Sequence, residues 1–420
     1  MSSSSVSLAH YRAALTAPGA AGPVMLSALG RLPIAMLSLA TLLYVQRATG
    51  SFAAAGLVSA GALAGVSLGS VAQGRLVDRL GPTRPLLVVA VLFAGAVALL
   101  VAAVEAAAPL ALLVALAALT GLVQPALAGA SRSLWTRLVP AGPLRDAAYA
   151  YEAISLEVFF ILGPALAVFL ATAPWPGTGL LVAAAGMLVG CTGFALTRAV
   201  RAQRPEPGQG RPAAARLGVI RGAGMRTVAL ASLGFGLVVG SVEVGVPAVT
   251  TAAGSPTLGG VLLSAWSVTS VLAGVLYAMR PWPRPLHLRI PALLAGFAGL
   301  VALMALTGPD GSLPVLVVAM LAAGALITPQ VTAHSLAVEV TAPPGSAAEA
   351  FGWVITAATL GLAGGQAAAG VVVEAFGPPA AFLAGGAAGA AIALALWARR
   401  ASLRPAPVLR EGVVPVTQLR

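Results

Sequence analysis

Long apolar runs recur along almost the whole chain and restrict its fold more than any other feature. Of the 420 residues, 59% are hydrophobic and only 9% are charged, which is far less charge than a soluble domain carries. An apolar run of about 18 residues can cross a bilayer, where only a backbone that satisfies its own hydrogen bonds is stable. The sequence therefore predicts an all-α membrane protein with twelve transmembrane helices. The expected spans are residues 22–44, 53–73, 85–104, 109–131, 148–171, 178–198, 226–250, 257–279, 288–307, 313–336, 348–373 and 380–398.

The arginines are distributed unevenly between the two sides of these spans. With the N-terminus placed in the cytoplasm, 22 of the 24 cations fall on the inner side, only Arg47 lies outside, and Arg31 lies within the first span. Arginine is enriched in cytoplasmic loops, so we expect both termini in the cytoplasm and a multi-pass protein of the cytoplasmic membrane. In a soluble chain the net charge of +12 would suggest nucleic acid. Here it indicates topology and contact with anionic lipid, and no nucleic-acid partner is expected.

One long polar connection divides the chain. Residues 199–222 are basic and rich in proline and glycine, which is typical of a linker. We therefore expect a cytoplasmic N-terminal segment, a six-helix bundle, a cytoplasmic linker, a second six-helix bundle and a cytoplasmic tail. Their expected bounds are 1–21, 22–198, 199–225, 226–398 and 399–420.

The two halves resemble each other in sequence. Leu26–Gly30 (LSALG) aligns with Leu230–Gly234 (LASLG) at an offset of 204 residues. At the same offset, Pro125 in the fourth span matches Pro329 in the tenth. Duplicated halves with a site between them are typical of secondary transporters. The sequence therefore predicts two pseudo-symmetric bundles.

A charged segment, Gly74–Arg84 (GRLVDRLGPTR), separates the second and third spans. We interpret it as a short turn, because Gly74 and Gly81 suit tight backbone and Pro82 prevents either helix from running through. The segment resembles the loop signature of the major facilitator superfamily, G-x-L-x-D-R-x-G-x-x-R. The residues that match are Gly74, Leu76, Asp78, Arg79, Gly81 and Arg84.

The resemblance implies two six-helix bundles around a central cavity that opens to each side of the membrane in turn, in a monomer. It also implies a gating role for the charged segment. Asp78 would face the N-terminal end of the eleventh helix, near residues 345–348, when the cavity is open to the outside. The second copy of the signature, Gly274–Arg280, lacks the aspartate. Glu339 and Glu349 are candidate partners for the arginines of the charged segment, with solvation at the surface as the alternative.

Several ionisable side chains are expected inside the spans. A charge at mid-bilayer costs at least about 2.5 kcal/mol, so such groups face a partner or a water-filled cavity. The candidates for a proton or substrate site are Arg31, Glu152, Glu157, Glu243 and His334.

Equal depth predicts one ion pair among them. Arg31 lies nine residues after Gly22, and Glu157 lies nine residues after Ala148, the expected start of the fifth span. Both spans begin on the cytoplasmic side, so both side chains lie about 13–14 Å deep at a rise of about 1.5 Å per residue. A proton or an anionic substrate group in the cavity could compete for an Arg31–Glu157 pair. A static structural pair is the alternative.

The remaining candidates have two interpretations each. Glu152 suits a cavity wall or the membrane interface, and Glu243 suits a second protonatable group or a cap on the outer mouth. His334 could titrate in the working range, although a neutral core histidine is the simpler interpretation. Gln124 is a further candidate for the cavity. Trp353 could line the cavity or belong to an interfacial belt.

The fifth span contains a Gly163-Pro164 step, which partly matches the fifth-helix signature of antiporters of the same family. A glycine–proline step frees a carbonyl group and allows the helix to bend. The step therefore suggests antiport.

These features together predict a secondary transporter. No Walker-type nucleotide loop is present, so a gradient, most simply of protons, is expected to drive transport. Resemblance to bacterial efflux members favours export of a small drug-like compound or metabolite, and proton-coupled import of a nutrient is the alternative. An enzyme or a receptor is less favoured, because the three histidines are scattered. No cofactor and no metal are expected.

Overall fold

The structure is a computed structural model that describes residues 8–140, 142–203, 218–279, 284–307, 313–343 and 347–404. Every regular element in these ranges is helical, and twelve helical segments are long and apolar enough to cross a membrane. The prediction of an all-α membrane protein with twelve spans is therefore confirmed.

The first half of the chain contributes six of these segments. They are α2 (Ala21–Thr49), α3 (Phe52–Leu80), α4 (Thr83–Glu105), α5 (Leu110–Leu122) followed by α6 (Leu127–Leu138), α7 (Pro143–Ala171) and α8 (Thr178–Leu196). The second half contributes α12 (Ala223–Ala252), α13 (Pro256–Met279), α14 (Leu286–Leu303), α15 (Leu313–Gly324) followed by α16 (Ile327–Thr341), α17 (Ala347–Phe376) and α18 (Pro378–Ala398). The short helices are α1 (Leu8–Leu15), α9 (Arg198–Arg201), α11 (Gly218–Arg221), η1 (Met304–Leu306) and η2 (Arg400–Leu403).

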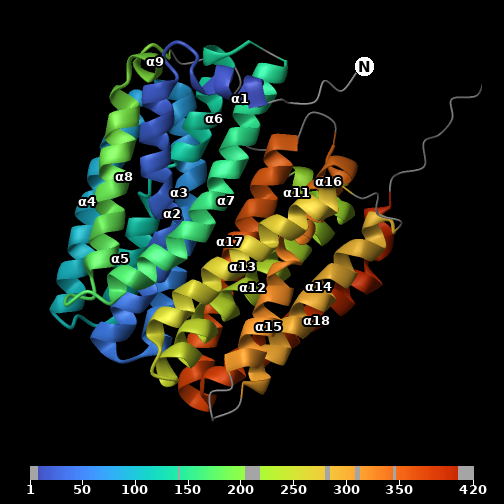
Figure 1. Ribbon diagram of the computed structural model, residues 1–420. Helices are drawn as coiled ribbons and strands as arrows, with labels where there is room; N and C mark the ends of the chain where they lie inside the picture. Colours follow the sequence, from blue (N-terminus) through green and yellow to red (C-terminus); the bar gives the residue numbers. More distant parts are fainter. Residues whose placement is uncertain are drawn as a thin grey trace, which may run out of the picture.

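The helices form two groups that converge at one end (Figure 1). The blue-to-green helices of the first half pack around α2, and the yellow-to-red helices of the second half pack around α12. We call the end that carries α1, α9, α11 and η2 the inner end, following the predicted arginine topology, and the opposite end the outer end. Contacts between the halves come mainly from α3 with α17 and from α7 with α13.

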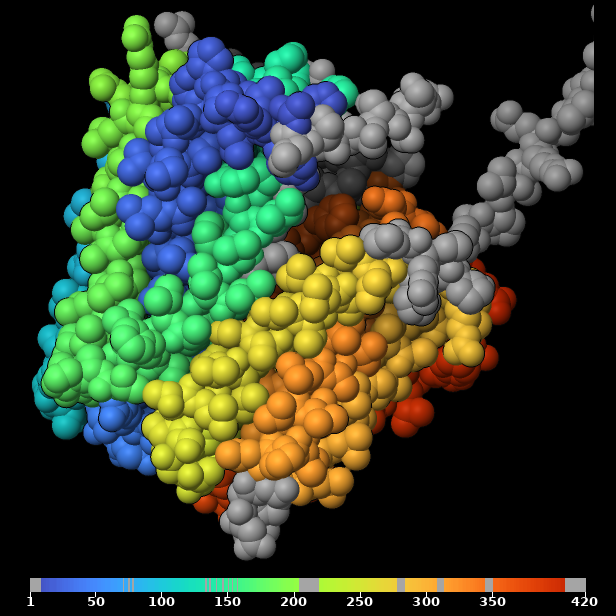
Figure 2. Space-filling view, in the orientation of Figure 1, coloured from blue at the N-terminus to red at the C-terminus, as the bar shows by residue number. Residues whose placement is uncertain are grey.

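Among the described residues, the apolar core is shared by the two halves at the outer end and is separate in each half at the inner end. One buried cluster at the outer end contains Leu42 of α2 together with Phe297 of α14 and Phe382 of α18. At the inner end each half has its own core, with Phe194 in the first and Leu396 in the second. The space-filling view shows the surface hollowed between the two halves near α1 (Figure 2). The molecule is therefore closed at the outer end and open at the inner end.

The charged segment is mostly helical, which corrects the turn expected from the sequence. α3 continues to Leu80, so Gly74 and Arg79 lie within the helix and the turn itself is Gly81-Pro82. Gly81 has a positive φ of 77°, which suits the tight backbone of the turn, whereas Gly74 is part of the helix. Residues 75–80 contain no glycine or proline, so nothing ends the helix earlier. The Asp78 side chain and its expected approach to residues 345–348 lie outside the described part of the structure.

The fourth and tenth spans are both broken near the middle. α5 ends at Leu122 and α6 begins at Leu127, with Pro125 in the break. α15 ends at Gly324 and α16 begins at Ile327, with Pro329 in the first turn. Interruptions at corresponding places in the two halves of a transporter indicate a binding region, and they agree with the predicted internal repeat.

Gln73 on α3 satisfies the backbone groups that the first break exposes. Its Nε2 donates to the carbonyl oxygens of Leu122 at 3.1 Å and Gln124 at 2.9 Å, and its Oε1 accepts from the N–H of Ala126 at 2.9 Å. Backbone groups without partners are costly in a membrane, so one buried amide stabilises the interrupted span.

We expect Gln73→Leu to destabilise the protein. Buried backbone groups left without a partner cost about 1–3 kcal/mol, so the thermal unfolding temperature in detergent should fall. Gln46→Leu, at the outer end of α2, is the matched control, because no described residue bonds to the Gln46 side chain. Unfolding of Gln73→Leu at the wild-type temperature would contradict this role.

Candidate functional site

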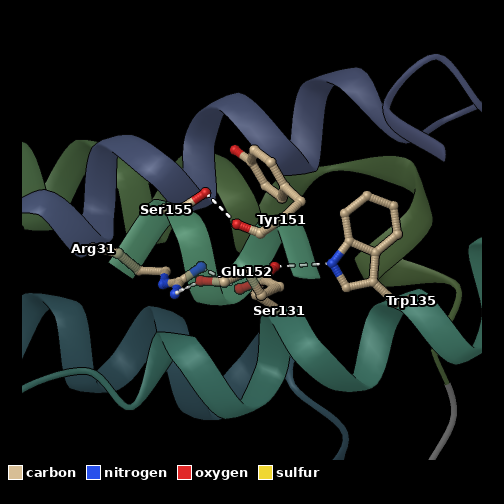
Figure 3. A network of polar contacts seen from close by, with 6 residues as sticks. All are labelled: Arg31, Ser131, Trp135, Tyr151, Glu152 and Ser155. Atoms are coloured by element: carbon tan, nitrogen blue, oxygen red, sulfur yellow. Dashed lines mark hydrogen bonds and ion pairs between the residues drawn. The ribbon is translucent and has the colours of Figure 1, made fainter. Parts of the chain in front are cut away.

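A buried ion pair lies where α2, α6 and α7 meet. Arg31 Nη1 pairs with Glu152 Oε2, and Arg31 Nη2 donates to the Glu152 carbonyl oxygen at 3.3 Å. Ser131 Oγ and Trp135 Nε1 donate to the other carboxylate oxygen, Oε1, at 2.7 and 2.9 Å (Figure 3). Arg31 and Glu152 are each only 4% exposed. Both oxygens of the carboxylate are therefore held in one fixed geometry.

Two aromatic residues, Phe159 and Trp135, contact this pair. The Arg31 guanidinium lies 5.7 Å from the centre of the Phe159 ring, a cation–π distance. Trp135 packs edge-on against Tyr151, with ring centres 6.5 Å apart. Arg31 Nε is buried and bonds to no described residue. The site thus has one unused donor in a cluster that is otherwise satisfied, and a buried donor of this kind calls for water or a ligand.

The partner of Arg31 differs from the predicted one. The expected pair was Arg31–Glu157, but Arg31 pairs with Glu152, and the Glu157 side chain lies outside the described part of the structure. The depth of the glutamate was counted from the wrong residue, because α7 begins at Pro143 and not at Ala148. Glu152 lies nine residues after Pro143, and Arg31 lies ten residues after the start of α2, so their depths agree.

A second polar cluster occupies a comparable depth in the second half. His334 Nδ1 lies 3.2 Å from Ser232 Oγ, and His334 Nε2 lies 2.8 Å from Gln330 Nε2. The ring also packs edge-on against Phe235 at 6.2 Å. His334 is 3% exposed, so it is a hydrogen-bonded core residue joining α12 to α16. Ser232 lies nine residues into α12, close to the depth of Arg31 in α2.

A third cluster crosses between the halves toward the outer end. Gln366 Nε2 on α17 donates to Glu243 Oε2 on α12 at 2.6 Å and to Ser38 Oγ on α2 at 3.0 Å. Ser38 Oγ in turn lies 3.2 Å from Ser59 Oγ on α3. Gln366 is fully buried, and its Oε1 bonds to no described residue. We call these four residues the outer latch, because the chain of hydrogen bonds joins the halves where they are closed.

The sequence comparison identifies the family. The family model described as Major Facilitator Superfamily matches residues 24–347. The chain belongs to this family. The fold and the charged segment of this facilitator agree with that membership, and the protein is a transporter of the major facilitator kind. No curated protein sequence matches the chain.

Solved structures of other transporters share the fold of this facilitator. The nucleoside transporter NupG superposes with a TM-score of 0.75 at 14% identity, over 90% of this chain and 99% of NupG. The human organic anion transporter MFSD10 gives 0.60 at 19% identity, over 90% and 99%. A bacterial homologue of the human lysosomal transporter Spinster, in an inward-facing and unoccupied conformation, gives 0.64 at 14% identity, over 94% and 97%.

The other residues expected in the site have different positions in this facilitator. Gln124 lies in the break of the fourth span, where its carbonyl oxygen accepts from Gln73. Trp353 packs, partly buried, against the inner core of the second half. α7 runs through Gly163 and Pro164 without interruption. A Cβ atom on Gly163 would lie 2.7 Å from the Cβ of Ala35, so this glycine permits α7 to approach α2 closely.

The expected gating residues Arg79 and Arg84 are exposed at the inner end of the facilitator. Glu105, at the outer end, was not among the expected site residues. Its position at the end of a span gave no sign in the sequence that its carboxylate accepts hydrogen bonds. Glu105 Oε1 accepts from Tyr44 Oη at 2.7 Å and from Trp175 Nε1 at 2.8 Å. No group of His, Cys, Asp or Glu among the described residues is arranged to hold a metal ion.

Proposed function

We propose that this transporter exports a small, partly apolar compound across the cytoplasmic membrane, driven by protons that move the opposite way. The observation that carries the proposal is the outer latch, in which one amide, Gln366, bonds both to the carboxyl group of Glu243 in its own half and to Ser38 in the other half. Loading of the substrate would occur from the recess at the inner end, and release would follow separation of the halves at the outer end.

The latch supplies a physical link between proton binding and closure. Glu243 forms no ion pair with any described residue and bonds to Gln366. A charged carboxylate without a cationic partner in a low-dielectric setting raises the free energy of the protein. Proton uptake neutralises the charge and removes this cost. The same proton changes Glu243 from a pure acceptor into a donor. The new O–H group of Glu243 can donate to Gln366 Oε1, which has no partner among the described residues. A rotation of the Gln366 amide to accept that bond alters its bond to Ser38.

The Arg31–Glu152 pair is the proposed substrate element of the same cycle. Its unused Arg31 Nε could bind an anionic or hydrogen-bonding group, and the aromatic residues beside it suit an apolar body. The arginine distribution supports a cytoplasmic-membrane location with both termini inside. We further propose that the protein acts as a monomer without a cofactor. Substrate binding and transport are the proposed activity, with no catalytic step.

The test is transport in proteoliposomes with an imposed pH gradient, screened over a library of small compounds. Wild-type protein should move a compound against its own gradient and opposite to the proton flow. Glu243→Gln should still equilibrate that compound but lose the response to the pH gradient, because the amide binds no proton. Glu374→Gln, which alters an exposed carboxylate near the outer end of α17, is the control and should behave as wild type.

Two results would contradict the proposal. One is a Glu243→Gln protein that keeps the full response to the pH gradient. The other is wild-type accumulation in the same direction as the proton flow, which would identify an importer.

A further inference from the structure

Two adjoining recesses lie at the inner end of the first half, beside α9. The larger has a volume of about 530 Å³ and contains Arg198 and Arg201 in its wall. The smaller, of about 230 Å³, is lined in part by Arg84, Arg201 and Gln203. Arg201 belongs to both walls, so the two form one feature, which we call the arginine recess. It is separate from the Arg31–Glu152 pair and from the outer latch.

The arginine recess is rich in donors that lack acceptors. The side chains of Arg84, Arg198 and Arg201 are exposed, and no described residue bonds to their guanidinium groups. No acidic residue appears among the described residues of either wall. The Nε2 atom of Gln203 is buried without a described partner. Three exposed guanidinium groups around one recess favour an anion with several acceptor oxygens.

The start of α4 adds to this potential. Thr83, the first residue of α4, lines the smaller recess, and no described side chain caps this helix. A helix of 23 residues carries a partial positive charge at its N-terminus, where anions are stabilised. Charged side chains, the buried amide donor of Gln203 and the helix end therefore favour the same kind of ligand.

The apolar surroundings narrow the choice of anion. Leu80 and Leu196 lie in the walls of the recess and are 53% and 54% exposed, and Val88 on α4 is 57% exposed. Leu196 ends a membrane-spanning segment and Val88 lies within one, so we expect the exposed apolar surface beside the recess to contact acyl chains. A ligand that satisfies both features carries an anionic phosphate on apolar chains. Basic pockets at the ends of transmembrane helices bind such head groups.

We propose that the arginine recess binds the phosphate group of an anionic phospholipid of the inner leaflet. The choice of leaflet rests on the proposed orientation of the transporter, whereas the binding chemistry does not. α9 begins the connection between the two halves, at the end of α8 (Figure 1). A lipid held there would fix the start of this connection against the turn between α3 and α4.

The test is binding of phosphatidylglycerol to the full-length protein in detergent, counted by native mass spectrometry, with phosphatidylcholine, a zwitterionic lipid of zero net charge, as the comparison. Each arginine removed near an anionic head group lowers affinity about fivefold. Arg198→Gln combined with Arg201→Gln should therefore weaken phosphatidylglycerol binding about 25-fold. Binding of phosphatidylcholine should stay unchanged.

The matched control combines Arg221→Gln with Arg404→Gln, two exposed arginines elsewhere at the inner end. This variant loses the same charge and should bind phosphatidylglycerol as wild type does. Replacing Arg198 and Arg201 by lysine should retain most of the binding, because lysine binds phosphate as a point charge. The lysine variant also separates a lost site from a failure to fold.

Three results would overturn the proposal. They are equal weakening in both glutamine variants, wild-type binding of phosphatidylglycerol no tighter than that of phosphatidylcholine, and full displacement of the lipid by excess inorganic phosphate. The last would show a site for the free anion. Because lipid binding is measured without transport, none of these results bears on the proposed export.

Discussion

Glu152→Ala is expected to destabilise the protein severely. It would leave the Arg31 guanidinium, only 4% exposed, without its carboxylate. It would also remove the acceptor that Ser131 and Trp135 share. Breaking a buried ion pair by deleting one partner costs about 3–5 kcal/mol. We expect a large fall in the yield of monodisperse protein and in its thermal unfolding temperature in detergent.

A double variant separates the structural role of this pair from its role in transport. Arg31→Met with Glu152→Gln removes both charges and keeps an amide oxygen for Ser131 and Trp135. Replacing a buried pair by neutral groups is often tolerated, so this protein should regain most of its stability. If the pair binds substrate, transport should remain lost.

Glu105→Gln is the control for Glu152→Ala. Like Glu152, Glu105 is a carboxylate that accepts hydrogen bonds from two side chains. Glu105 is exposed, so its substitution should change the unfolding temperature little. A Glu152→Ala protein as stable as this control would contradict the structural role of Glu152. A double variant that transports normally would contradict its functional role.

Gly56→Val is expected to produce the largest conformational change. A Cβ atom on Gly56 would lie only 2.4 Å from the carbonyl oxygen of Gln366 on α17. α3 and α17 would have to separate at this point, which strains the closed outer end. Overpacking of this kind costs about 1–3 kcal/mol, which shifts a two-state equilibrium about 5- to 150-fold. The population should therefore move towards the conformation that is open at the outer end.

The chain is well suited to measuring this shift. Its single cysteine, Cys191, is buried and forms no disulfide, and Cys191→Ala supplies a background for labelling. Spin labels on Thr49→Cys and Thr251→Cys, exposed outer-end positions of the two halves, report the distance across the closure. That distance should increase in Gly56→Val. It should not change in Gly95→Val, because a Cβ atom at Gly95 meets no described atom within 4 Å. Equal distances in Gly56→Val and wild type would refute the closure.

The sequence predicts the architecture well because an apolar run that crosses a bilayer must satisfy its own backbone hydrogen bonds, which leaves very few possible folds. Hydropathy locates all twelve spans, and the counting of equal depths leads correctly to a pair between Arg31 and a glutamate of the fifth span. The identity of that glutamate depends on the true start of α7. Residues 143–147 are the first five residues of α7. Because they include Arg145 and Asp146, they are too polar to be assigned to the span from hydropathy. An error of five residues was enough to select Glu157 in place of Glu152.

The outer latch and the role of Gln73 could not be read from the sequence. Ser38, Ser59 and Gln366 are neutral residues in apolar helices, and a hydroxyl or amide group there gives no pattern until the helices are packed. Gln73 gains its role from a break that lies about 50 residues away in the chain. Pro125 and Pro329 entered the sequence analysis only as evidence for the internal repeat, and their places at the two broken spans became visible with the structure.

The broken fourth span also connects two regions that lie far apart in the sequence. α6 carries Ser131 and Trp135, which bond to Glu152, and it begins next to Ala126, whose N–H group bonds to Gln73. Gln73 directly precedes the charged segment. α6 is only 12 residues long and is separated from α5. One short helix therefore joins the hydrogen bonds around Glu152 to the residue that lies just before the arginines of α3.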